Sequence, residues 1–190
     1  MPSQEKRKRN VKVEPTSTCE FVEVVDAFDR PIAVLPLLEV HRQRLRHRSV
    51  MVLVYDLHGK VFLQKRNAAK TVYPGRWDLS ATGHVRAGES REDAALRELD
   101  EELGIRVESL ELRHCVDAGP DTNWEFVSLY SAGRLAQRPE PNPQELSGGY
   151  FFDQQELECL VATFPDMLTP GLIHFWENGL IFSSPDPQSA

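Results

Sequence analysis

The sequence predicts an α/β fold in which helices cover both sides of a mixed β-sheet, with a β-hairpin extension at the N-terminus. The chain has 190 residues and 41% hydrophobic content, which suffices for one domain with a good core and hardly for two. Short β-rich runs recur along it, together with helical stretches that have clear start and stop signals. We therefore expect one domain over residues 19–182, between disordered tails of residues 1–18 and 183–190.

The N-terminal part of the chain is basic and then β-rich. Residues 1–18 carry a cluster of four basic side chains whose role the sequence leaves open, Lys6, Arg7, Lys8 and Arg9. Two β-rich runs around a turn at Asp29 predict a hairpin over 21–36, and 37–48 resembles a short amphipathic helix that completes an extension over 19–48. The exposed face of this helix is basic and is either solvated or a contact surface for phosphate, through Arg42, Arg44, Arg46 and Arg48.

The rest of the sheet is predicted from two pairs of strands. The continuous apolar run at 49–56 is typical of a buried strand, and Gly59 turns the chain back into its hairpin partner at 61–66. Two further strands flank the loop 119–122, and Glu125 on the second points either toward the site or away from it. A final helix is predicted by its N-cap, first-turn proline and terminal glycine, which are Thr169, Pro170 and Gly179.

The stretch from residue 83 to 105 combines a glycine loop, a capped helix and a cluster of carboxylates. Ser90 with Asp93 is typical of a helix N-cap, and Gly104 stands where a left-handed C-cap is expected, so the helix should span 91–103. One stripe of this helix is apolar, formed by Ala95, Leu96, Leu99 and Leu103. Another edge carries three carboxylates at spacing i, i+3 and i+4, here called the box glutamates: Glu98, Glu101 and Glu102.

The box glutamates predict a metal site. Like charges at this spacing destabilise an isolated helix by about a few tenths of a kcal/mol per pair, so a purely structural helix would normally interleave lysines. Carboxylate oxygens suit Mg²⁺, or the similar Mn²⁺, and Mg²⁺ commonly bridges to substrate phosphates. The net charge is −7, and more than half of it lies in 83–105, where seven acidic residues face three arginines. This local acidity fits a metal site and argues against general affinity for nucleic acid.

Nine residues of the stretch fill every fixed position of the Nudix box, so the chain resembles the Nudix superfamily: Gly83, Glu89, Arg97, Glu98, Leu99, Glu101, Glu102, Gly104 and Ile105. The resemblance implies a Nudix-type α/β/α sandwich and hydrolysis of a nucleoside diphosphate linked to another moiety. It also implies Mg²⁺ on the box glutamates and on the Gly83 carbonyl. Glu98 is our first choice for the general base, and Arg97 is expected to orient a glutamate through a two-pronged hydrogen bond.

A finer resemblance, to the isopentenyl diphosphate isomerase branch of the superfamily, extends from about Phe21 to Phe182. It rests on the order of the segments LRHRSV, LQKRNAAK, YPGRW and SATGHV. In that branch the residues that match Arg66 and Lys70 contact the substrate diphosphate, so both are predicted to bind it here. Arg48 is a third candidate for substrate binding.

The chain departs from the isomerases at two points that concern the reaction. Isomerases protonate carbon with a cysteine just before a Gly-His step, where this chain has Thr82. Isomerases also commonly lose box glutamates, and all three are present here. Hydrolysis is therefore favoured, with isomerisation and a non-catalytic nucleotide-binding module as the alternatives.

Two further predictions concern histidines and a downstream acid. His47 and His84 match metal-ligand positions of the isomerases, but His41 does not fall at the expected spacing from His47. We therefore expect satisfied structural histidines rather than a complete second metal site. Glu145 lies on a loop where Nudix enzymes often place a catalytic base or an extra ligand, so it is either the alternative to Glu98 as base or an exposed carboxylate.

The remaining sequence features bound the setting of the protein. Three widely separated cysteines, Cys19, Cys115 and Cys159, predict neither a disulfide framework nor a metal cluster, so the reducing cytoplasm is expected. There is no apolar run of membrane-spanning length and no export signal. The predicted partner is a small diphosphate, with nucleotides favoured, while the moiety attached to it and the oligomeric state stay open.

Overall fold

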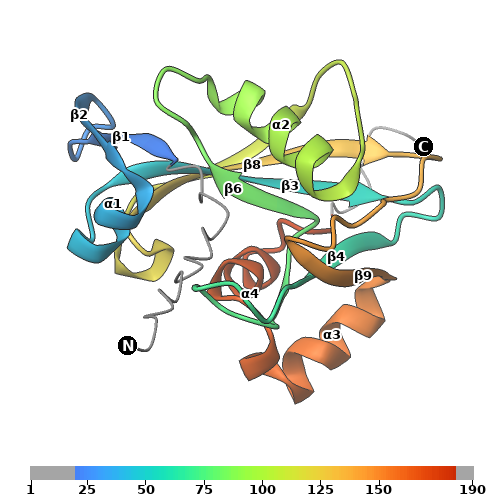
Figure 1. Ribbon diagram of the computed structural model, residues 1–190. Helices are drawn as coiled ribbons and strands as arrows, with labels where there is room; N and C mark the ends of the chain where they lie inside the picture. Colours follow the sequence, from blue (N-terminus) through green and yellow to red (C-terminus); the bar gives the residue numbers. More distant parts are fainter. Residues whose placement is uncertain (1–19, 183–190) are drawn as a thin grey trace, which may run out of the picture.

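The computed structural model describes residues 20–182, so the predicted tails lie outside the described part of the chain. A mixed sheet forms the middle layer, with helix α2 on one face and helices α3 and α4 on the other (Figure 1). This confirms the predicted α/β/α sandwich. The strands are β1 (Phe21–Val25), β2 (Pro31–Pro36), β3 (His47–Tyr55), β4 (Val61–Arg66), β5 (Trp77–Asp78), β6 (Ala81–His84), β7 (Glu111–Val116), β8 (Glu125–Arg134) and β9 (Leu146–Phe152). The helices are α1 (Leu37–Gln43), α2 (Arg91–Leu103), α3 (Gln154–Thr163) and α4 (Pro170–Glu177).

Strand β3 is the centre of the sheet, which runs β5-β4-β3-β8-β7, and it pairs in parallel with β8 and antiparallel with β6. The predicted β3–β4 hairpin is paired only at Tyr55 and Val61, and β4 then pairs with β5 and β9 instead. The Ser80 hydroxyl bridges the two strands where they separate, because it accepts from the Val54 N–H at 2.8 Å and donates to the Phe62 carbonyl at 2.6 Å. This leaves one edge of β3 for β6, which leads into α2.

Two hydrophobic cores hold the layers together. The core under α2 includes Ala95, Leu99 and Leu103, all fully buried, as the predicted apolar stripe requires. Leu96 is only half-buried, and Ala94 is buried in addition. The second core lies under α3 and α4 and includes Phe175. No helix in residues 20–182 is long and apolar enough to cross a membrane.

The N-terminal hairpin is confirmed, whereas the helix after it is shorter than predicted. Strands β1 and β2 pair antiparallel, and a small core of their own includes Val22, Val24 and Val40 of α1. The prediction of a helix over 37–48 is wrong beyond Gln43, because Arg44 takes a left-handed conformation with φ of 53° and ends α1. The chain then extends, and β3 begins at His47.

Candidate active site

The candidate site is built on the loop between β6 and α2 and on the buried edge of that helix. Both predicted caps are present: Ser90 accepts from the Asp93 N–H, and Gly104 takes a left-handed conformation with φ of 64° that ends α2. A side chain at Gly83 would collide with Glu98, since an added Cβ would lie 2.1 Å from the Glu98 Cδ. Glycine at this position therefore lets the strand backbone lie directly against the Glu98 carboxylate.

The box glutamates are not equivalent. Glu98 and Glu102 are buried, at 9% and 4% exposure, while Glu101 is exposed and ion-paired with Arg97 and Arg86. The Glu102 carboxylate accepts hydrogen bonds from the Thr82 N–H at 2.9 Å and from Gln64 at 3.0 Å. These donors fix its position but supply no positive charge.

Burial dominates the electrostatics of the two inner carboxylates. It raises the pKa of Glu102 to about 8, and the nearby Glu98 charge adds to the shift. Burial also raises the pKa of Glu98, against the opposing charge of Arg97 and with a contribution from Glu101. The site therefore holds two acids that burial disfavours as carboxylates, which is the electrostatic setting that a bound cation would relieve.

Arg97 ties the loop to the helix. Its guanidinium donates two hydrogen bonds to Glu89, at 2.8 and 2.9 Å, and one to the His84 carbonyl at 2.9 Å. It also donates to Glu98 and, at 3.2 Å, to Glu101. The predicted two-pronged hydrogen bond is thus made to Glu89, and the same guanidinium orients the Glu98 carboxylate.

The two predicted diphosphate-binding residues, Arg66 and Lys70, lie at the end of β4 and on the loop after it. Arg66 is mostly buried and pairs with Asp78 at 3.2 Å, and its Nη1 lies 3.5 Å from the Thr82 hydroxyl. Lys70 forms an ion pair with Glu145, and the Asn67 N–H donates to the Glu145 carbonyl at 3.1 Å. Arg66 and Glu102 thus share Thr82 as a neighbour, and Lys70 and Glu145 contact each other on the loops that follow β4 and precede β9.

Arg48 is placed differently. Its guanidinium contacts the Glu23 carboxylate at 2.7 Å and both the side chain and the carbonyl of Asp29 at 2.7 Å. These contacts attach the hairpin to β3. Its predicted part in substrate binding stays a prediction, and the donors it would use are engaged by the hairpin.

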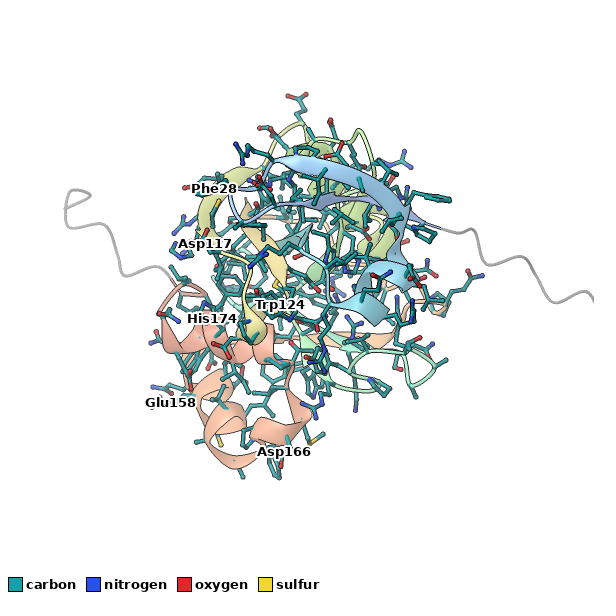
Figure 2. The ribbon with its side chains drawn as sticks, turned by 90° about the vertical axis from the view of Figure 1, so that its left-hand side faces the viewer. Phe28, Asp117, Trp124, Glu158, Asp166 and His174 are labelled. Atoms are coloured by element: carbon teal, nitrogen blue, oxygen red, sulfur yellow. The ribbon has the colours of Figure 1, made fainter. Side chains whose placement is uncertain are left out.

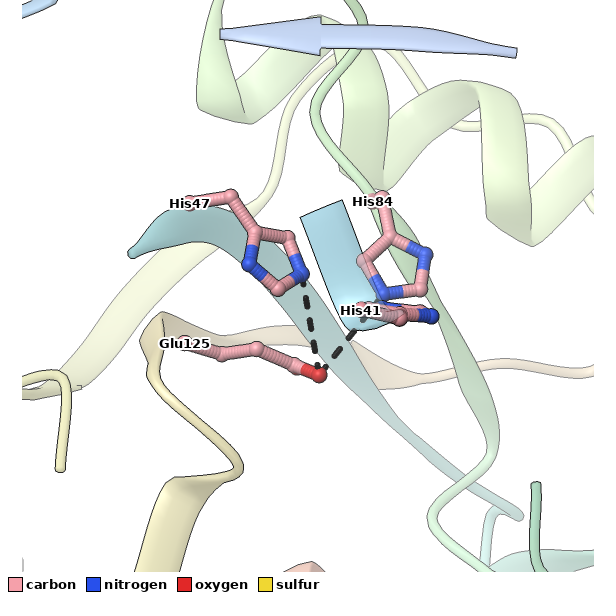
Figure 3. A group of neighbouring side chains, drawn as sticks. All are labelled: His41, His47, His84 and Glu125. Atoms are coloured by element: carbon pink, nitrogen blue, oxygen red, sulfur yellow. Dashed lines mark ion pairs between the residues drawn. The ribbon is translucent and has the colours of Figure 1, made fainter. Parts of the chain in front are cut away.

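Three histidines and a glutamate form a second polar cluster beside the Gly83 loop (Figure 3). The cluster, here called the histidine cluster, consists of His41, His47, His84 and Glu125, and one ligand atom from each lies within 4.8 Å of the others. The three ring centroids are 5.0 to 5.2 Å apart. Glu125 Oε1 lies 3.8 Å from His47 Nε2 and 3.7 Å from His84 Nε2. Glu125 therefore points into the histidine cluster, while its relation to the proposed metal site of the box glutamates stays a prediction.

The expectation of satisfied structural histidines is wrong for His41 and His47. The Nε2 atoms of both are buried without a hydrogen-bond partner. Burial lowers the pKa of His41 to about 4 and also lowers that of His47, which leaves neutral imidazoles with free lone pairs. An orphaned buried nitrogen is costly unless a ligand takes it up.

His84 and Glu125 form a charged pair in the same cluster. Burial alone would lower the pKa of His84, but its ion pair with Glu125 outweighs burial and raises it. Burial alone would likewise raise the pKa of Glu125, but the His84 contact holds it at about 2. Imidazole nitrogens with one carboxylate are a donor set for a transition metal or Zn²⁺ rather than for Mg²⁺. The residues of the histidine cluster therefore fit a divalent ion of that kind.

A family model for the NUDIX domain matches residues 45–170 of the chain. The chain belongs to the Nudix family. The matched segment contains the whole Nudix box, the residues Arg66, Lys70 and Glu145, and the histidine cluster except His41.

Several relatives carry the Nudix hydrolase name, and others are isomerases. The uncharacterized Nudix hydrolase PA4841 of Pseudomonas aeruginosa is 46% identical over 90 residues, and the match spans 47% of this chain and 53% of that protein, about half its length. The uncharacterized Nudix hydrolase SCO1686 of Streptomyces coelicolor is 36% identical over 75% of this chain and 80% of that protein. Isopentenyl-diphosphate Delta-isomerase of Nocardia farcinica is 34% identical, and the match spans 82% of this chain and 92% of that protein. The family and the hydrolases in it support a Nudix pyrophosphohydrolase.

Solved structures agree with the Nudix fold. The crystal structure of DR0079 from Deinococcus radiodurans covers 76% of this chain and 90% of its own, with a TM-score of 0.66 and 24% identity. The structure of the Nudix domain of Shewanella oneidensis NrtR in complex with ADP ribose covers 76% of this chain and 97% of its own. The TM-score is 0.55 and the sequence identity 18%. At these identities the likeness concerns the fold alone.

Proposed function

We propose that this Nudix protein is a metal-dependent hydrolase that cleaves the diphosphate linkage of a nucleoside diphosphate joined to another moiety. The observation that carries the proposal is the buried pair Glu98 and Glu102, which lies against the Gly83 backbone with Arg97 as its only contacting cation among residues 20–182. Two acids in this environment favour uptake of a divalent cation.

The ligands proposed for Mg²⁺, or Mn²⁺, are the box glutamates and the Gly83 carbonyl. When bound, the ion supplies charge neutralisation for the diphosphate and lowers the pKa of water. Glu98 is the proposed general base and Arg97 orients it, while Glu145 is the alternative base. Arg66 and Lys70 are proposed to bind the diphosphate, which requires Lys70 to exchange its ion pair with Glu145 for the substrate.

The test is phosphate release from a panel of diphosphates with Mg²⁺, with Mn²⁺ and with a chelator. The panel should hold sugar nucleotides, dinucleotides, coenzyme A, nucleoside triphosphates and ADP-ribose, because the NrtR domain is complexed with that last compound. Metal-dependent cleavage of at least one compound is expected. Tight binding of a nucleotide without turnover would instead favour a non-catalytic binding module.

Isomerisation of isopentenyl diphosphate is the second candidate, and the histidine cluster is the observation that favours it. Two of its members, His47 and His84, match isomerase metal-ligand positions, and isomerases occur among the relatives. Thr82 at the cysteine position is against it, because a hydroxyl is a poor acid for protonating carbon. Deuterium uptake from solvent into isopentenyl diphosphate would establish this activity, and its absence alongside diphosphate cleavage would eliminate it.

A further inference from the structure

Strand β4 carries a buried amide at a position where an apolar side chain would be expected. Phe62 belongs to the core under α2, and Gln64 lies two residues further along β4, on the same face of the sheet. Figure 2 draws the side chains and shows the space between the layers filled by them. Gln64 is fully buried there. A buried amide is costly unless its polar atoms are satisfied, so packing alone does not account for glutamine at this position.

The two polar atoms of the Gln64 amide differ in their surroundings. Nε2 donates to Glu102 Oε2 at 3.0 Å and to the Thr82 hydroxyl at 3.3 Å. The amide oxygen, Oε1, is buried without a hydrogen-bond partner. Both side-chain partners of Gln64 among residues 20–182 therefore belong to the candidate active site, and its amide oxygen opposes folding.

The hydrogen bonds to the Glu102 side chain all reach one of its two oxygens. Gln64 Nε2 and the Thr82 N–H, the latter at 2.9 Å, both donate to Oε2. The other oxygen, Oε1, accepts no hydrogen bond from residues 20–182 and is not one of their buried unpartnered atoms, so it borders solvent. A carboxylate held in this way presents one free oxygen in a fixed direction.

We propose that Gln64 is a positioning residue that orients Glu102, so that Glu102 Oε1 faces the divalent cation. The inference rests on the proposed function, because that function supplies the cation. A neutral amide restrains the carboxylate without cancelling the charge that binds the ion, whereas lysine or arginine at this position would pair with it. The other donor is the backbone N–H of Thr82, so Gln64 is the side chain whose removal tests the idea.

The backbone of Gln64 is held independently of its side chain. It pairs with Asp78 of β5 on one side and with Gly149 of β9 on the other. The side chain reaches from β4 to β6 and α2, where Thr82 and Glu102 lie. A substitution can therefore remove the amide while the strand stays paired.

The experiment measures the rise in Tm that Mg²⁺ causes in the full-length protein and in Gln64→Met, which has a similar size and no N–H donor. Mg²⁺ is the probe because it prefers oxygen ligands, so it does not report on the histidine cluster. The apparent Mg²⁺ affinity should fall about 10–100-fold in Gln64→Met, as is usual when a residue that supports a metal ligand is lost. Tm in chelator should stay near that of the wild type, because the variant loses the unpartnered acceptor together with the donor.

Kinetics on a compound that the wild type cleaves provide a second measurement. The Mg²⁺ concentration for half-maximal activity should rise by the same factor, while kcat at saturating Mg²⁺ stays within about threefold of the wild type, because excess ion restores the orientation of the carboxylate. A purely structural role would not separate these two quantities. Gln64→Leu removes the same donor with a shorter side chain and should give the same loss, so the test does not depend on how one apolar side chain fits.

The matched control is Gln137→Met, which removes an amide that donates to the Gly104 carbonyl at 2.9 Å, at the end of the same helix. It should leave the Mg²⁺ affinity unchanged. Equal Mg²⁺ affinity in the wild type, Gln64→Met and Gln64→Leu would overturn the inference alone. A wild type without any Mg²⁺-induced rise in Tm and without metal-dependent cleavage would overturn the proposed function, and the inference with it.

Discussion

The backbone of Gly83 lies against the carboxylate of Glu98 so closely that no side chain fits between them. Gly83→Ala should therefore displace the Glu98 carboxylate while the strand keeps its pairing. We expect kcat to fall at least about a hundredfold, on the scale of losing one oriented catalytic group. Steady-state kinetics with Mg²⁺ measures this.

The matched control for that substitution is Gly119→Ala. Gly119 has an extended backbone, and a Cβ there meets nothing within 4 Å. It should keep wild-type kcat and Tm. Equal activity of Gly83→Ala and wild type would show that the contact with Glu98 has no part in the reaction.

Removing charge from either buried box glutamate should abolish most activity without unfolding the protein. Glu98→Gln and Glu102→Gln are each expected to lower kcat at least about a hundredfold, because the proposed metal loses a charged ligand. Glu108→Gln, at an exposed position after the helix, is the control and should be neutral. Loss of folding in the two variants, monitored by circular dichroism, would instead assign the buried pair a structural role.

The raised pKa of Glu102 predicts how the chelated protein responds to pH. The pKa rises from an ordinary 4.5 to about 8 on folding, so between these values the folded state binds more protons than the unfolded state. Stability should then fall as pH rises from about 5 to 8, by at most about 1.4 kcal/mol per pH unit for one proton. Denaturant melts in chelator measure the slope. Glu102→Gln should flatten it, and an unchanged slope in that variant would assign the proton elsewhere.

Two kinetic effects are expected from the proposed diphosphate-binding residues Lys70 and Arg66. Lys70→Ala should raise KM, since it removes a point charge from the diphosphate and frees Glu145. Arg66→Ala would also leave the buried Asp78 without its partner, so Arg66→Lys is the better variant. This variant keeps the positive charge but loses the bidentate geometry of the guanidinium. It should lower kcat/KM by the equivalent of about 2 kcal/mol.

The control for both basic variants is Lys60→Ala, whose partners Asp153 and Glu156 lie at the start of α3. Its kcat/KM should equal that of the wild type. If Lys70→Ala and Arg66→Lys also keep the wild-type kcat/KM, the diphosphate contacts lie elsewhere. The arginines of residues 42–48 are then the next candidates.

The metal content of variants should distinguish an ion at the histidine cluster from an ion at the box glutamates. Zn²⁺ or Co²⁺ is expected to bind the wild type at the histidine cluster, and His41→Gln should lose this ion while Mg²⁺-dependent activity titrates separately. Elemental analysis and the visible spectrum of the Co²⁺ form measure the loss. His114→Gln, on exposed β7, is the control. Equal metal content in all three proteins would mean that the histidines hold no ion.

Local sequence signals predicted the fold and the box well. The caps Ser90 and Gly104, the hairpin turn and the apolar stripe of α2 each depend on residues a few positions apart, so the sequence alone carries them. The end of α1 was missed, because nothing in the residue type of Arg44 indicates a left-handed conformation.

That missed turn also explains the missed cluster. The spacing of His41 and His47 suits no regular element, but the turn at Arg44 brings the helix end beside the strand start and the two rings together. Glu125 joins them through the parallel pairing of β8 with β3, where His47 lies opposite Glu125. Such a contact across 78 positions depends on tertiary topology, which residue patterns do not encode.

Because β4 separates from β3 at Ser80, the residues of the site fall into two groups carried by different strands. Strand β3 carries His47 and is paired with both β6 and β8, so it bears Gly83, His84 and Glu125 on one rigid frame. Arg66 is the last residue of β4, and Lys70 lies on the loop after it. Strand β4 pairs with β3 only through Val61, at the end of β4 opposite Arg66. The hydrogen bond from Gln64 of β4 to Glu102 is then the contact that fixes the distance between these cations and the buried acids. A substitution of Gln64 would therefore loosen the basic residues from the acids without touching either group directly.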